Sequence, residues 1–163
     1  MGFLLLLSHQ DEITKPIILD FGTGNKRRRI NISEYSQVHS KVFRDALLGF
    51  HSFTGCDSVS CFAGKGKLKP LKIMQQNHEI LFSDFGRSVE LSDDMIDQLE
   101  TYVCKMYGKT SASSVNKVRY DIVRQRLGAG CSNEPLSCHK GIDLSHLPPC
   151  RSSLHKHIKR ANY

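Results

Sequence analysis

The sequence lacks any long apolar segment. The apolar run near its start, Phe3 to Leu7, is far shorter than the roughly 20 residues that a membrane helix needs. No basic residue precedes this run, as a secretory signal would require, and Leu6 occupies the position where a myristoylation signal carries Ser or Thr. We therefore expect no membrane partner and an intracellular protein, nuclear or cytoplasmic, whose six cysteines are reduced.

Several cofactor and catalytic motifs are also missing. The FGTGNK stretch (residues 21–26) lacks the third glycine of a dinucleotide fingerprint. The GKGK stretch (residues 64–67) lacks both the spacing and the following Ser or Thr of a nucleotide P-loop. No cysteine has a recognisable base at the spacing of a Cys/His nucleophile. These absences predict a protein without a small-molecule cofactor and without a catalytic serine or cysteine.

Positive charge is in excess, and tryptophan is absent. Lysine and arginine outnumber aspartate and glutamate by 7, and the excess is spread along the chain. Such a balance is compatible with a polyanionic partner, DNA or RNA, and equally with an unspecialised basic protein. The run Lys26 to Arg29 also has two interpretations, since it fits a nucleic-acid or nuclear-import patch and equally a solvated basic turn.

The patterning predicts an α/β fold. Phe3 to Leu7 is typical of a strand buried on both faces of a parallel sheet, and its start near residue 1 leads us to expect a missing upstream part. Ile17–Asp20 and Arg29–Ile32 predict a hairpin around the glycines of FGTGNK. We expect three segments: a core at 1–82, a helical extension at 83–127, and a Gly/Ser/Pro-rich loop with a terminal helix at 128–163, which also stops where a helix can continue.

Helical spacing is clear in the rest of the chain. The expected helices are one capped by Ser33 and continuing to Phe50, a short one at Leu68–Met74, one from Ser92 to Gly108, one at about Val115–Leu127 with an exposed basic face, and a last one at 151–163. Pro70 is compatible with the second of these because first-turn amides need no partner within the helix.

The stretch FTGCDSVSCFAGKGK, residues 53–67, carries the chemistry. Asp57 follows an apolar helix, and for a random aspartate a role in the turn is the simpler interpretation. A glycine- and lysine-rich loop follows and opens a helix, an arrangement in which backbone amides and lysines favour a phosphate. The members of that loop are Gly64, Lys65, Gly66, Lys67 and Lys69.

This stretch resembles the signature of flap-endonuclease/XPG nucleases, in which a hydrophobic helix ends in Gly-x-Asp before a glycine hairpin. The resemblance implies that Asp57 is a catalytic residue and a ligand of a Mg²⁺ or Mn²⁺ pair. It implies that Gly64, Lys65, Gly66, Lys67 and Lys69 hold the backbone of branched or structured DNA. Lys65 departs from the family pattern, which has a hydrophobic residue between the glycines, and Pro70 stands where a small helix former is usual.

A wider resemblance covers most of the chain. The order of the GTG hairpin, FTGCD, GKGK, VCKMYG and LPPCRSSLHKHIKRANY is similar to a family of multi-copy animal proteins linked to mobile elements, which carry a PIN-like nuclease core. The resemblance implies a partial PIN-like parallel sheet with a hairpin, followed by a mainly helical C-terminal half. In that superfamily further aspartates precede the first strand, and a metal pair needs several carboxylates.

Three interpretations of function follow. The chain is a fragment of a metal-dependent, structure-specific DNA endonuclease, inactive alone because the upstream acidic residues are missing. The alternatives are a non-catalytic nucleic-acid-binding or interaction module, and a truncated mobile-element relic. We also considered a structural zinc site and expect ordinary loop cysteines and surface histidines instead, because the spacings fit no standard zinc pattern. Its candidate ligands are Cys131, Cys138, His139 and Cys150.

Overall fold

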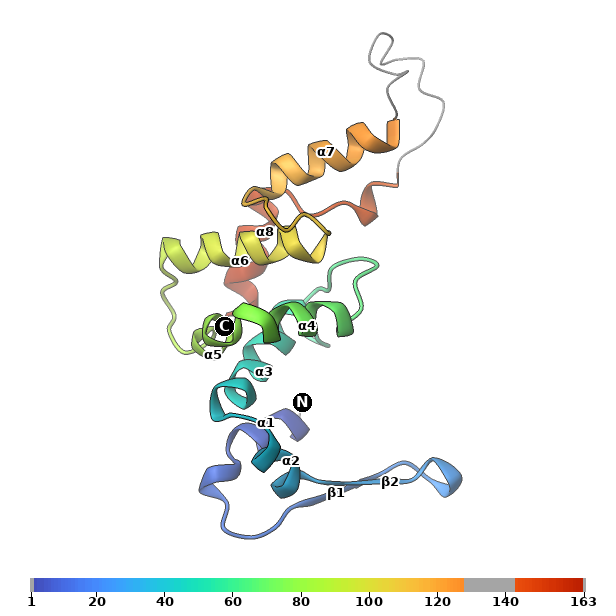
Figure 1. Ribbon diagram of the computed structural model, residues 1–163, viewed down its shortest axis with the longest axis vertical. Helices are drawn as coiled ribbons and strands as arrows, with labels where there is room; N and C mark the ends of the chain where they lie inside the picture. Colours follow the sequence, from blue (N-terminus) through green and yellow to red (C-terminus); the bar gives the residue numbers. More distant parts are fainter. Residues whose placement is uncertain (1, 128–142, 163) are drawn as a thin grey trace.

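The computed structural model describes residues 2–127 and 143–162 and has a mixed α/β fold that is mostly helical (Figure 1). The helices are α1 (Gly2–Ser8), α2 (Ile32–Val38), α3 (Lys41–Thr54), α4 (Leu68–Asn77), α5 (Glu79–Asp84), α6 (Asp93–Met106), α7 (Val115–Leu127) and α8 (Arg151–Ala161). The strands are β1 (Ile18–Phe21) and β2 (Arg28–Asn31). No helix in the described ranges is long and apolar enough to cross a membrane.

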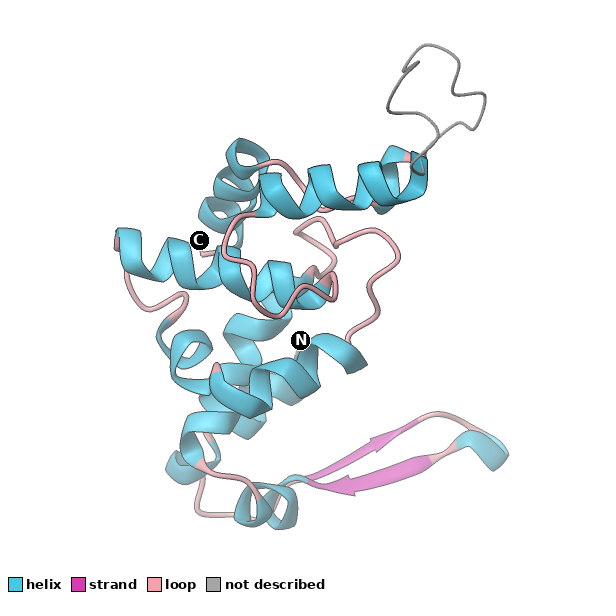
Figure 2. Ribbon diagram, turned by 45° about the horizontal axis from the view of Figure 1, so that its top comes forward, coloured by secondary structure: helices cyan, strands magenta, loops and turns pink. Residues whose placement is uncertain are grey.

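The predicted hairpin is confirmed. β1 and β2 pair in antiparallel register, from Ile18 opposite Asn31 to Phe21 opposite Arg28. The turn depends on glycine, because Gly22 has a φ of 85° that side-chain-bearing residues rarely adopt. Figure 2 shows this ribbon extending away from the helices.

The predicted parallel sheet is wrong for the described part of the chain, where the two strands of the hairpin form the sheet. Phe3 to Leu7 lies in α1, which packs on α3. A short apolar run does not distinguish a strand from a buried helix. Leucine is a strong helix former and lacks the β-branch that favours strands. Leu7 is fully buried while Leu5 is 46% exposed, as expected for a helix with one covered face.

The predicted helix from Ser33 to Phe50 is two helices. α2 is capped by Asn31, whose side chain accepts the backbone N–H groups of Ser33 and Glu34. Ser40 then caps α3 by accepting the N–H of Phe43 at 3.1 Å. The apolar spacing continues across this break, which explains why periodicity alone predicted one helix.

The later helices agree better with the sequence. Ser92 caps α6 through the N–H of Met95 at 3.2 Å, and Gly108 ends this segment with a φ of 84°. The buried side of α8 carries Leu154, Ile158 and Ala161, as predicted. Helix α5 was not predicted, since its six residues are too few to show a period.

One aromatic cluster joins α3 to the last helix, α8. Phe53 of α3 lies at its centre, with ring centroids 5.5–6.0 Å from its aromatic neighbours. Those neighbours are Phe62, Phe82, Phe85, Tyr102 and His157. The segment 53–62 and helix α8 therefore share a core, and this core fixes the base of the loop that carries Asp57.

Candidate nucleic-acid interface

Asp57 lies at the exposed tip of a tight turn. The turn is closed by two backbone hydrogen bonds between Cys56 and Val59, at 3.0 and 3.3 Å. Gly55 ends α3 with a φ of 103°, and a Cβ there would collide with the backbone of Cys61. The chain therefore needs glycine at this point to turn out of the core, and the turn projects the Asp57 carboxylate into solvent.

The described surroundings of Asp57 do not make a metal site. The shallow hollow beside it is lined by His51, Cys56, Cys61 and Lys67 among others, and Asp57 is the one carboxylate among its lining residues. In the described ranges no group of three or more His, Cys, Asp or Glu side chains is placed to hold a metal ion. A Mg²⁺ or Mn²⁺ pair requires several carboxylates, so such a pair would need carboxylates from outside these residues.

Lys67 is directed back toward α3. Its Nζ donates to Nδ1 of His51 at 2.8 Å and to the His51 carbonyl at 3.3 Å. Burial lowers the pKa of His51, and the charge of Lys67 lowers it further, so the imidazole is neutral and accepts the hydrogen bond. Lys67, predicted to contact DNA, therefore docks the loop onto α3.

Lys65 lies on the other side of the loop. Its Nζ is 4.1 Å from the centre of the Tyr107 ring, a cation–π contact that holds the side chain. Burial lowers the pKa of Lys65, and the positive charges of Lys69 and Arg126 lower it further. We call the set Lys65, Lys69 and Arg126 the basic patch.

The basic patch is only partly neutralised, because among the described residues the Asp143 carboxylate lies near Arg126 and the charge of Arg126 lowers its pKa. Within residues 2–127 and 143–162, none of its three members forms an ion pair. Among the described residues Arg126 donates a long hydrogen bond, 3.5 Å, to the carbonyl of Asp143. The like charges of the basic patch repel one another, and a bound polyanion would relieve that repulsion.

Two glycines of the loop have different roles. Gly64 has a φ of 67°, and a Cβ there would lie 2.8 Å from Nδ1 of His146. Gly66 has a φ outside the left-handed region, and a Cβ there would meet nothing within 4 Å. Gly64 therefore lets the loop pass close to the segment after α7, while Gly66 leaves the surface next to Lys65 open.

A buried carboxylate positions α7, which carries Arg126. Glu100 of α6 is 2% exposed, and its Oε1 accepts the N–H of Val115 at 2.9 Å, at the first residue of α7. Its Oε2 accepts from Nε of Arg151 at 3.1 Å. Neither this role of Glu100 nor the contact of Tyr107 with Lys65 was predictable from the sequence, because the two partners of each contact lie far apart along the chain.

Most of the candidate zinc ligands, Cys131, Cys138 and His139, lie outside the described residues. Cys150 is described and forms the N-cap of α8. Hydrogen bonds from the Ser152 and Ser153 hydroxyls lower its pKa to about 6.

Comparison with known proteins gave no match: no family model, no curated protein and no solved structure matches this chain. The resemblance to flap-endonuclease/XPG nucleases therefore stays a prediction from the motif at residues 53–67.

Proposed function

We propose that this chain binds the phosphodiester backbone of nucleic acid through the basic patch. The observation that carries the proposal is that Lys65, Lys69 and Arg126 act on one another electrostatically and form no ion pair among the described residues. The loop and α7 meet the same short segment, since Gly64 approaches His146 and Arg126 donates to the carbonyl of Asp143. Phosphate groups supply the negative charge that this arrangement lacks.

The electrostatics of Lys65 support an anionic ligand. Both causes that lower its pKa, burial and neighbouring positive charge, act against its protonated form. A phosphate beside Lys65 stabilises the protonated form, so binding offsets the unfavourable effect of burial and neighbouring charge on this ammonium group. Its contact with Tyr107 holds the ammonium group in place and reduces the entropy lost on binding.

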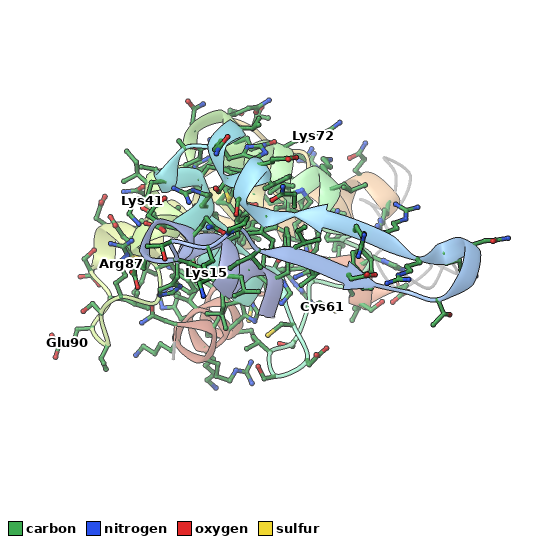
Figure 3. All side chains as sticks on the ribbon, turned by 90° about the horizontal axis from the view of Figure 1, so that it is seen from below. Lys15, Lys41, Cys61, Lys72, Arg87 and Glu90 are labelled. Carbon is green, nitrogen blue, oxygen red and sulfur yellow. The ribbon has the colours of Figure 1, made fainter. Side chains whose placement is uncertain are left out.

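The start of α4 adds to the same surface. The helix begins at Leu68, and its N-cap residue, Lys67, makes no side-chain hydrogen bond to the first turn. The positive end of the helix dipole and the first-turn amides favour an anion there. Lys69 and Lys72 lie exposed on the first two turns (Lys72 is labelled in Figure 3).

A binding titration with a fluorescently labelled oligonucleotide duplex at low salt tests the proposal. Replacing Lys65, Lys69 and Arg126 by alanine should weaken binding about a hundredfold, at roughly 1 kcal/mol for each charge removed. A control that removes three exposed lysines elsewhere, Lys15, Lys156 and Lys159, should weaken it less than threefold. Equal losses in both variants would mean that net charge, and not the basic patch, binds the duplex.

Metal-dependent hydrolysis of structured DNA is the second candidate, favoured by the exposed Asp57 beside a lysine-rich loop. It applies to a protein in which further carboxylates reach Asp57 and complete a site for Mg²⁺ or Mn²⁺. In an assay with either metal, we expect the present chain to bind DNA without cutting it. In a protein that does cut, cleavage unchanged by Asp57→Ala would remove Asp57 from the catalytic site.

A further inference from the structure

The β-hairpin is a free-standing ribbon. It packs mainly against α2 and is anchored at its base, where the N–H of Ile32 donates to the carbonyl of Ile17 at 2.9 Å. Beyond that base, the ribbon projects from the same side of the molecule as the 55–67 loop and α7 (Figures 1 and 2). Figure 3, from below, shows its outer end extending beyond the helices.

The two faces of the ribbon differ in chemistry. Side chains alternate between the faces of a strand, so Asp20 and its partner Arg29 share one face, while Phe21 and its partner Arg28 share the other. Leu19, on the face of Phe21, packs on the core at the base of the ribbon. Phe21 lies two residue pairs farther out and is 44% exposed.

The charges of the ribbon are unequally paired. Asp20 accepts two hydrogen bonds from Arg27, at 2.8 and 2.6 Å, and a third from Arg29 at 3.2 Å. Within the described residues Lys26 and Arg28 form no ion pair. Asp20, the one carboxylate of residues 18–31, is thus held by two arginines. The outer end of the ribbon presents an exposed aromatic ring opposite Arg28, with Lys26 in the turn that follows.

We propose that Phe21 and Arg28 form a stacking platform for an unpaired base of single-stranded nucleic acid, with Lys26 beside the adjoining phosphate. The inference deepens the proposed function, which supplies the ligand class, by assigning single-stranded segments to the hairpin. Directly opposite residues on neighbouring strands have Cβ atoms about 5 Å apart. At that spacing the Phe21 ring and the Arg28 guanidinium group are close enough to contact the same base.

Single-stranded nucleic acid fits this surface better than a protein strand does. A half-exposed phenylalanine near the tip of a thin ribbon has little apolar surface around it for a protein partner to bury. Bases, by contrast, stack on single aromatic side chains, and arginine adds both stacking and charge. Residues 18–31 carry four basic side chains against one acidic. This net positive charge attracts the phosphates that accompany the base.

The absence of tryptophan from the chain makes a direct test possible. The Phe21→Trp variant carries a single indole, placed at the proposed platform. Its emission should be quenched when an oligothymidylate strand is added, because stacking places a base on the indole ring. Strong binding of that strand with unchanged emission overturns the proposal.

Alanine substitutions provide the second measurement. Stacking on one aromatic ring contributes enough that Phe21→Ala should weaken oligothymidylate binding about five- to hundredfold, while duplex binding changes less than twofold. The matched control is Ile18→Ala, which removes a 58% exposed apolar side chain from the opposite face and should change neither. Equal effects of the two substitutions overturn the proposal and favour a general loss of the hairpin or a protein partner.

The basic-patch variant separates this inference from the proposed function. If the alanine variant of Lys65, Lys69 and Arg126 loses duplex binding and the Phe21→Trp emission still responds to single strands, both proposals hold. If the basic-patch variant binds duplex normally while Phe21→Ala loses the single strand, the proposed function fails and the hairpin inference stands. If the basic-patch variant loses duplex binding and Phe21→Ala binds the single strand normally, the proposed function holds and the hairpin inference fails.

Discussion

The turn at Asp57 and the loop at Gly64–Lys69 belong to one short stretch of sequence, yet the structure gives them different surroundings. The turn exposes one carboxylate, with Lys67 and no second acid lining the hollow beside it. The loop brings Lys65 to an aromatic ring and next to an arginine that comes from α7. The difference teaches that the acidic and the basic part of one short motif can depend on different regions of the chain.

The Asp57 turn and the basic patch also differ in the contacts that hold them in place. The turn is closed by its own backbone hydrogen bonds, so its shape is local. The basic patch is assembled through α7, and α7 depends on the buried Glu100. Changes far from the loop should therefore damage the basic patch and leave the Asp57 turn intact.

The largest effect should come from Glu100→Ala. This change leaves the N–H of Val115 without its acceptor and removes one of the two carboxylates that Arg151 contacts, the other being Asp97. Together these losses should cost about 2–4 kcal/mol. Urea unfolding measures the loss, with the exposed Glu90→Ala as the control, expected to change stability by less than about 0.5 kcal/mol. Equal stabilities of the two variants would contradict the role of Glu100 in positioning α7.

A smaller effect distinguishes the two loop glycines. Gly64→Ala should cost about 1–3 kcal/mol because its backbone lies in the left-handed region and the new methyl group meets His146. Gly66→Ala, which meets open space, should cost less than about 1 kcal/mol. Thermal unfolding of the two single variants checks this order, and a larger loss for Gly66→Ala would contradict the different roles of the two glycines.

The smallest effect is expected at Asp57. The side chain is exposed and lies at a turn closed by backbone groups, so Asp57→Ala should change the stability by less than about 0.5 kcal/mol. Duplex binding should stay the same or become slightly tighter, because a negative charge near Lys67 is removed. A loss of binding beyond threefold would mean that the carboxylate takes part in holding the duplex.

The sequence predicted those parts of the fold that short-range chemistry determines. The glycines of residues 22–24 and the cap at Ser92 identified the hairpin and α6 correctly. The length of the run Phe3–Leu7 suits a buried strand as well as a short helix, so the sequence alone does not distinguish the two. The structure has a helix there, which packs on α3. The break between α2 and α3 at Ser40 could not be predicted either, because the apolar spacing continues across it. The break depends on the Ser40 hydroxyl accepting the N–H of Phe43.

The candidate site was predictable to a similar degree. The order Asp57, Gly64, Lys65 predicted an aspartate at a turn and then a glycine- and lysine-rich loop that opens a helix, and the structure has this arrangement. The direction of each lysine was not predictable, because Lys65 and Lys67 alternate along the loop and meet partners from different helices. The contribution of Arg126 requires the tertiary placement of α7, which no local pattern encodes.

The salt dependence of duplex binding tests the central claim most directly. Each phosphate contact releases counterions, so removing one cation of the interface should lower the slope of log K against log salt concentration by about 1. The account predicts that the alanine variant of Lys65, Lys69 and Arg126 has a slope smaller by about 2–3 than the unmodified chain. A slope that stays the same in that variant would contradict the assignment of the basic patch as the surface that holds nucleic acid.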